Sequence, residues 1–127
     1  RDLVRARGLG DEYKGQVVTN GAAVAAALIE KPDIDVIMVG GRMNTDLGAC
    51  VDAQALAEIG RFSIDAYVIG ACGVDPAAGL MAQSFEESTI KRAIAAQSRT
   101  ILAPLITEKF SVRAPFAVIT LSEKTTL

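Results

Sequence analysis

The chain has 127 residues, half of them hydrophobic, a formal net charge of −2, a pI near 5.1 and a mean hydropathy of +0.32. This composition excludes a disordered chain, and the acidic balance argues against a nucleic-acid surface, which is normally basic. No stretch reaches the roughly 18 consecutive apolar residues that a membrane-spanning helix needs. We therefore expect a globular domain whose core is built from Ala, Val, Ile and Leu, because aromatic residues are sparse and Trp is absent.

The cysteines and the ends of the chain add two expectations. Cys50 and Cys72 show neither C-x-x-C nor zinc-site spacing and no signal peptide is visible, so we expect a reduced, cytoplasmic setting. The chain opens on Arg1 rather than Met and closes on Leu127 without a helix cap. We interpret residues 1–127 as a single domain from a longer protein, truncated at its N-terminus.

In the first half of the chain, residues 1–9 place Leu3, Val4 and Leu9 among arginines, which indicates a short amphipathic helix. Strands are predicted over 16–19 and 35–39. Between them we predict an Ala-rich helix over 22–30, with Asn20 as its N-cap. A second helix is predicted over 52–59, closed by Gly60 at the C′ position.

The second half continues the alternation, with a strand over 66–69, a helix over 86–98 and strands over 100–103 and 116–121. The strand over 35–39 is a continuous apolar run from Val36 to Val39, as is typical of parallel strands covered on both faces. We therefore predict a Rossmann-like α/β fold with a mainly parallel sheet flanked by helices and right-handed crossovers.

The most informative motif is the glycine-rich turn from Gly70 to Asp75, which follows the strand over 66–69 and is itself followed by Gly79. Ligands of open α/β sheets bind at the carboxyl ends of the strands, so a pocket is expected here. The chain has no His and no evident nucleophile–base pair.

Two further strand ends carry candidate ligand-binding residues. Gly40-Gly41 brings backbone close to an anion in one interpretation and makes a tight turn with positive φ in the other. Thr19-Asn20-Gly21 offers N–H groups and a hydroxyl to a phosphate, or is an ordinary helix start. Neither segment belongs to a G-x-G-x-x-G or Walker A motif, so a dinucleotide site or a P-loop NTPase is not indicated.

Ionisable side chains near these turns have the same two interpretations. The candidates are Asp75, Glu86, Glu87, Lys91 and Lys109. A carboxylate beside a lysine can abstract a proton. Glu86 and Glu87 are equally explained as acids in the first turn of a helix, where the helix dipole favours them. Glu87 and Lys91 have the spacing of a surface i,i+4 pair, and for Glu86, Glu87 and Lys91 these structural interpretations are favoured. Cys72 is either a reactive thiol or a small buried residue, and no His is present to activate it.

Six short motifs fall in the order and spacing of a known family: Thr19-Asn20, Val39-Gly40-Gly41, Asp65 to Gly70, Gly73-Val74-Asp75, Gly79-Leu80, and Glu86-Glu87 with Lys91-Arg92-Ala93. Over roughly residues 15–127 the chain resembles the C-terminal sensor domain of DeoR-type bacterial transcriptional repressors. The resemblance implies a fold similar to that of ribose-5-phosphate isomerase and coenzyme A transferases. It also implies a phosphorylated sugar as effector, homo-oligomerisation, no cofactor, and DNA binding through an N-terminal winged helix-turn-helix that this chain lacks.

By the same resemblance, Thr19, Asn20, Gly40, Gly41, Gly73 and Asp75 line the effector pocket. Glu87 lies at its rim, and Lys109 helps to hold the phosphate. The family usually has Leu-Ala-Asp-x-x-Lys-Phe after the fourth strand. In this chain Pro104 stands at the Asp position, and Lys109 comes two residues later than usual.

Three functions follow from these observations. The first is a sensor without catalytic residues, in which effector binding shifts an oligomer between two states. The second is a sugar-phosphate isomerase, which turnover of ribose 5-phosphate would reveal. The third is an oligomerisation module that binds no ligand.

Overall fold

The computed structural model describes residues 3–6, 15–70, 73–75, 79–104, 114–122 and 124–126, and gives only the backbone of β1 and β7. Its elements in chain order are β1 Leu3–Ala6, β2 Gly15–Thr19, α1 Ala22–Leu28, β3 Ile34–Met38, β4 Met43–Asn44, β5 Ala49–Cys50, α2 Ala53–Ile59, β6 Ile64–Val68, β7 Gly73–Asp75, β8 Gly79–Ala82, α3 Phe85–Ala96, β9 Ser98–Leu102, β10 Phe116–Ile119 and β11 Thr125–Thr126.

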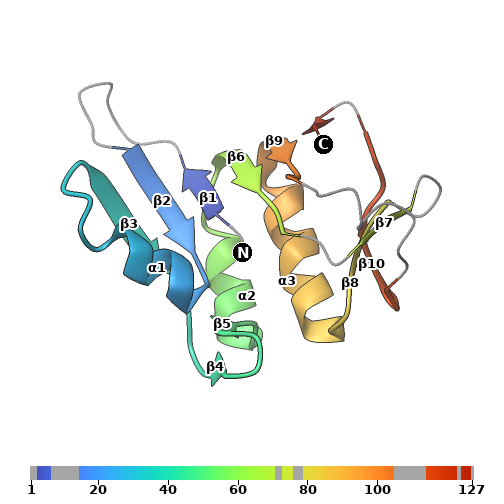
Figure 1. Ribbon diagram of the computed structural model, residues 1–127, viewed down its shortest axis with the longest axis horizontal. Helices are drawn as coiled ribbons and strands as arrows, with labels where there is room; N and C mark the ends of the chain where they lie inside the picture. The colour runs from blue at the N-terminus through green and yellow to red at the C-terminus, as the bar shows by residue number, and fades with distance from the viewer. Residues whose placement is uncertain are drawn as a thin grey trace.

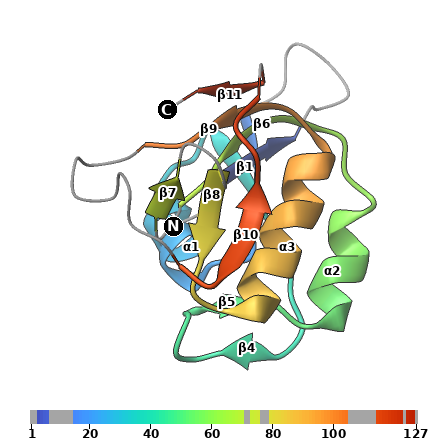
Figure 2. The ribbon, with the colours of Figure 1, turned by 90° about the vertical axis from the view of Figure 1, so that its right-hand side faces the viewer.

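The main sheet has six strands in the order β11-β9-β6-β1-β2-β3 (Figure 1). The pairs β2–β3, β6–β9 and β9–β11 are parallel, and β1 alone runs against its two neighbours. Helices α2 and α3 lie side by side on one face, and α1 lies on the other face beside β3 (Figures 1 and 2). The predicted α/β fold with a mainly parallel sheet is therefore confirmed.

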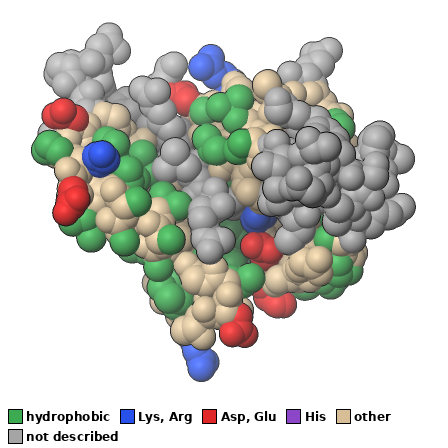
Figure 3. All heavy atoms as spheres, in the orientation of Figure 1, with side chains coloured by type: hydrophobic (Ala, Val, Ile, Leu, Met, Phe, Trp, Pro, Cys, Tyr) green, Lys and Arg blue, Asp and Glu red, His purple; other side chains and the backbone are tan. Residues whose placement is uncertain are grey.

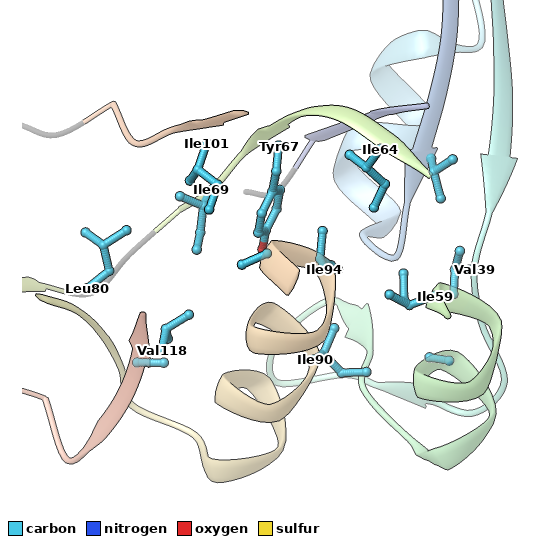
Figure 4. Packing of buried hydrophobic residues seen from close by; sticks show 14 of the residues in the cluster. Val39, Ile59, Ile64, Tyr67, Ile69, Leu80, Ile90, Ile94, Ile101 and Val118 are labelled. Carbon is cyan, nitrogen blue, oxygen red and sulfur yellow. The ribbon is translucent and has the colours of Figure 1, made fainter. Parts of the chain in front are cut away.

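The core lies between this sheet and the pair α2 and α3. Val18, Tyr67 and Ile101 occupy equivalent positions on their strands and are fully buried. They belong to one cluster with Ile90 and Ile94 of α3 (Figure 4). Each such side chain contributes roughly 1.5–3 kcal/mol on transfer out of water. This packing fixes the strand ends that carry the candidate site.

Helix α1 contributes little to the core. The helix reads Ala-Ala-Val-Ala-Ala-Ala-Leu, yet none of its residues is buried, and Ile29 at its C-cap is 80% exposed. Apolar side chains consequently lie at the surface over this part of the molecule (Figure 3).

A second, three-stranded antiparallel sheet in the order β10-β8-β7 packs against α3 (Figure 2). Gly79 begins β8 with φ +87°, and a Cβ there would collide with the carbonyl oxygen of Ile119 on β10. Glycine is required at this position on both grounds. The predicted strand over 116–121 exists as β10, but it pairs in this sheet and not in the parallel one.

Several local predictions were wrong. Leu3–Ala6 is a strand, not a helix, because its backbone pairs with both β2 and β6. The N-cap of α1 is Gly21, with no side-chain bond, so Asn20 is not the cap. Gly60 is the C-cap of α2 in the right-handed conformation, not a left-handed C′ residue. Ser98 begins β9 instead of ending α3.

Candidate functional site

The register of the main sheet brings four strand ends to one edge. Thr19 pairs with Met38 between β2 and β3, and Val68 pairs with Leu102 between β6 and β9. Strand β1 lies between the two pairs, with Leu3 opposite Val68. The segments that follow β2, β3 and β6 therefore leave the sheet at the same edge. They begin with Asn20, Val39 and Ile69, and we call this the carboxyl edge.

At β2, the residues after the strand are held by the hairpin of β4 and β5. The side-chain amide of Asn20 donates to the carbonyl of Cys50 at 3.0 Å, and the Cys50 N–H donates to the Asn20 carbonyl at 2.9 Å. The Gly21 N–H donates to Thr19 Oγ1 at 3.0 Å, and the Ala22 N–H donates to the Gly48 carbonyl at 2.9 Å. Two of the amides at the start of α1 thus already have acceptors within the chain.

At β3, Gly40 and Gly41 are glycines because other groups come close to them. A Cβ at Gly40 would lie 3.0 Å from Cys50 Sγ, and one at Gly41 would collide with the carboxylate of Asp52. The described glycines with positive φ are Gly48 and Gly79, so the interpretation of Gly40-Gly41 as a positive-φ turn was wrong. The other interpretation, in which this backbone lies close to an anionic ligand, stays a prediction.

Asp52 is the residue that sequence reasoning missed at this edge. Its two carboxylate oxygens accept the N–H groups of Arg42 at 2.8 Å and Ala55 at 3.0 Å. These backbone hydrogen bonds, that from Arg42 first, hold the pKa of Asp52 below its ordinary value of 3.8. An Asp just before an Ala-rich helix signals an N-cap, and Asp52 is the N-cap of α2. The hydrogen bond that Asp52 accepts from Arg42 connects the segment after β3 to that helix. No local sequence pattern predicts this hydrogen bond.

At β6, the strand end is held from α3. The Lys91 ammonium donates to the carbonyl of Gly70 and lies 3.7 Å from Glu87 Oε2. Lys91 is only 8% exposed, so its assignment to a surface ion pair was wrong, although its i,i+4 partner was correct. Ser84 caps α3 by accepting the N–H of Glu87 at 3.2 Å, which fixes the first turn of the helix.

The structure thus gathers Thr19, Asn20, Gly40 and Gly41 beside the hairpin, and Glu87 beside Gly70. Gly73 and Asp75 lie in β7, whose backbone pairs with β8, so the predicted glycine-rich turn is partly a strand. Lys109 and Cys72 lie outside the described residues. Glu86 lies in the first turn of α3 and is exposed, as the helix-dipole interpretation expects.

A comparison with protein families shows that residues 3–127 match the model of the DeoR C-terminal sensor domain. The chain belongs to this family. It is 30% identical over 99 residues to the glycerol-3-phosphate regulon repressor of Escherichia coli (strain K12), a match that covers 78% of the chain and 39% of that repressor. The repressor of the same name from Haemophilus influenzae is 30% identical over 106 residues, which cover 84% of the chain and 41% of the relative. The chain thus spans about two fifths of the length of these relatives.

In this DeoR sensor domain, two cavities of about 300 Å³ are lined wholly by described residues, and one of them reaches the carboxyl edge at Val39. One lies between α3, β9 and β10, with Arg92 and Lys124 in its lining. The other lies beside β3 and the end of α2 and is lined by Ile37, Met38 and Phe62 among others. Their linings share no residue with the predicted effector site.

Two further observations concern only the described part of this sensor domain. Within it, no three His, Cys, Asp or Glu side chains gather closely enough to hold a metal ion. None of its helices has the length and apolar character required to cross a membrane.

Proposed function

We propose that this DeoR sensor domain binds a phosphorylated sugar or polyol at the carboxyl edge and through it controls DNA binding by the regulator to which it belongs. The observation that carries the proposal is the shared edge itself. It places Thr19, Asn20, Gly40 and Gly41 on the same side of the sheet as Gly70, where the Lys91 ammonium is fixed. Ligands of open α/β sheets bind in this position.

We place the phosphate on the β6 side of the edge. The amides of Gly21 and Ala22 already donate to Thr19 and Gly48, and Arg42 N–H donates to Asp52. A phosphate on the β2 side would have to displace these acceptors. Gly73, Asp75 and Glu87 belong to the proposed site on the β6 side. Lys109, which lies outside the described residues, stays a candidate for the phosphate on the family resemblance alone. Thr19 and Asn20 would then face the carbon chain and hydroxyl groups of the ligand.

The names of the relatives suggest a compound to test first. Both are glycerol-3-phosphate regulon repressors, so sn-glycerol 3-phosphate is the first candidate for this chain. A ligand that binds only the folded state raises its apparent stability, by about 2.7 kcal/mol at 100-fold over the dissociation constant. We further propose that the domain acts as a homo-oligomer and has no enzymatic activity of its own.

The test is a thermal unfolding screen of the chain with sn-glycerol 3-phosphate, ribose 5-phosphate and fructose 6-phosphate, and with glycerol, ribose and fructose as matched controls. We expect a rise in Tm with one phosphorylated compound and none with its parent. Equal shifts with a phosphorylated compound and its parent, or with inorganic phosphate alone, would contradict the proposal. Conversion of ribose 5-phosphate would identify an isomerase instead.

A further inference from the structure

Lys91 is a charged side chain in an unusual position. It lies on α3 between the buried residues Ile90 and Ile94 and is itself 8% exposed. Lysine is almost never buried in this way unless it is paired, because moving an ammonium out of water is costly. The burial of the Lys91 ammonium at the carboxyl edge therefore indicates a role beyond stabilising α3.

The contacts of Lys91 connect α3 to the end of β6. Its ammonium donates to the carbonyl of Gly70, 21 residues earlier in the chain, and Glu87 lies one helical turn away with its carboxylate 3.7 Å from the ammonium. Counted for the side chain alone, the exposed fraction is 10% for Lys91 and 23% for Glu87, so both are largely shielded from solvent. The carboxylate therefore compensates the charge while the ammonium holds a main-chain atom.

The main-chain atom is the point at which β6 leaves the sheet. Ile69 is fully buried, and its N–H donates to the carbonyl of Leu102 on β9 at 2.8 Å. Gly70 follows directly, and three residues later the chain enters β7, which contains Gly73 and Asp75. The hydrogen bond from Lys91 to Gly70 therefore fixes the point at which the chain leaves β6, before it enters β7.

We infer that Lys91 is a positioning residue of the effector site, which fixes the end of β6 at the carboxyl edge by holding the Gly70 carbonyl, with Glu87 fixing the ammonium. This inference rests on the proposed function. Buried ion pairs often contribute little net stability compared with apolar residues of similar volume. A role in placing the ligand-binding backbone explains why an ion pair occupies this position.

The chain offers a matched control in Lys124. Its ammonium also donates to main-chain carbonyls, those of Ala95 at 2.9 Å and Ser98 at 3.1 Å, at the other end of α3. Lys91 and Lys124 therefore make the same kind of bond from a lysine to a backbone carbonyl. Of these two lysines, Lys91 makes this bond at the carboxyl edge and Lys124 makes it away from that edge.

The experiment compares Lys91→Met, Lys91→Arg and Lys124→Met with the unaltered chain. The first readout is the dissociation constant of sn-glycerol 3-phosphate by calorimetry, and the second is hydrogen exchange of a peptide spanning residues 68–75 without ligand. We expect K91M to weaken binding by about tenfold or more, as loss of a charged hydrogen bond does. K91R, which keeps charge and donors, should recover part of the loss, and K124M should bind within about twofold of the unaltered chain. Exchange over residues 68–75 should be faster in K91M only.

Unaltered affinity in K91M, or equal losses in K91M and K124M, would overturn the inference and leave Lys91 a stabilising residue only. If K91M does not fold, Lys91→Gln replaces it, because Gln keeps an N–H donor without the charge. If the unaltered chain binds none of the phosphorylated compounds, the proposed function fails. Exchange over residues 68–75 then decides on its own whether Lys91 positions this segment.

Discussion

At the scale of single residues, Asp52 governs how the glycine turn after β3 is held. One carboxylate oxygen caps α2 through Ala55 and the other accepts the N–H of Arg42 next to Gly41. Asn at this position still provides one acceptor for the helix, but its NH₂ group cannot accept the Arg42 N–H. We therefore expect Asp52→Asn to unfold at a lower urea concentration than the unaltered chain at pH 7.

The loss of stability in D52N should become smaller as the pH falls. The pKa of Asp52 is lowered in the folded state, so its contribution is fully present above the ordinary value of 3.8 and is lost as the pH falls through the folded-state pKa. Urea midpoints measured from pH 7 down to acid should therefore converge for the two proteins. Asp46→Asn, in the exposed turn between β4 and β5, is the control. A constant difference between D52N and the unaltered chain at every pH would contradict this account.

At the scale of elements, α1 and α3 differ in how firmly they are held. Helix α3 has a Ser84 cap, acidic residues in its first turn and five buried residues, whereas α1 has none of these features. Ile94 is fully buried on α3, and Ile29 at the end of α1 is 80% exposed. The substitution of Ile by Ala tests both positions with the same chemical change.

We expect Ile94→Ala to lower the free energy of unfolding by about 2–5 kcal/mol, because it leaves a cavity in the core. Ile29→Ala should stay within about 0.5 kcal/mol, as is usual for surface substitutions. Urea unfolding followed by circular dichroism measures both values. Similar losses in the two variants would mean that α1 is covered in solution, as a subunit interface would cover it.

At the scale of the whole molecule, β1 joins the two halves of the main sheet. It pairs with β2 on one side and β6 on the other, and no ladder connects those two strands directly in the described residues. Val4 lies opposite Val18 and Tyr67 at once. Proline has no N–H to donate and is tolerated at sheet edges but not in central strands.

Val4→Pro should therefore lower the free energy of unfolding by at least about 1–3 kcal/mol, because it leaves a buried hydrogen-bond partner in a neighbouring strand unsatisfied. Thr126→Pro, on the edge strand β11, should lower the free energy of unfolding by clearly less than Val4→Pro does. Thermal unfolding of the two variants against the unaltered chain gives the comparison. Equal losses would show that the β1 ladders do not hold the sheet together.

The parts of the fold that sequence predicted are those whose signal is local. The alternation of strands and helices indicated a mainly parallel sheet, and Thr19, Asn20, Gly40 and Gly41 were recognised at the ends of its strands. Strand β1 was misread because arginines among apolar residues suggest a helix over so short a segment. Its pairing with β6, about 60 residues away, decides the conformation.

The candidate site shows the same limit. The i,i+4 spacing revealed Glu87 as the partner of Lys91, but the contact that buries Lys91 comes from Gly70 on another element. Likewise, Gly40 and Gly41 were recognised, whereas their neighbours Cys50 and Asp52 depend on how the hairpin folds back. The roles of these residues in effector binding stay predictions.

The antiparallel course of β1 also determines how the sheet responds to mechanical load. Leu3, Val68, Leu102 and Thr126 lie in one row across four strands, so Leu3 and Thr126 sit at the same edge of the sheet. A force applied between Leu3 and Thr126 pulls across the strands rather than along them. We therefore expect the hydrogen bonds between neighbouring strands to break one residue pair after another rather than all together. The first pairs to separate are those at the carboxyl edge.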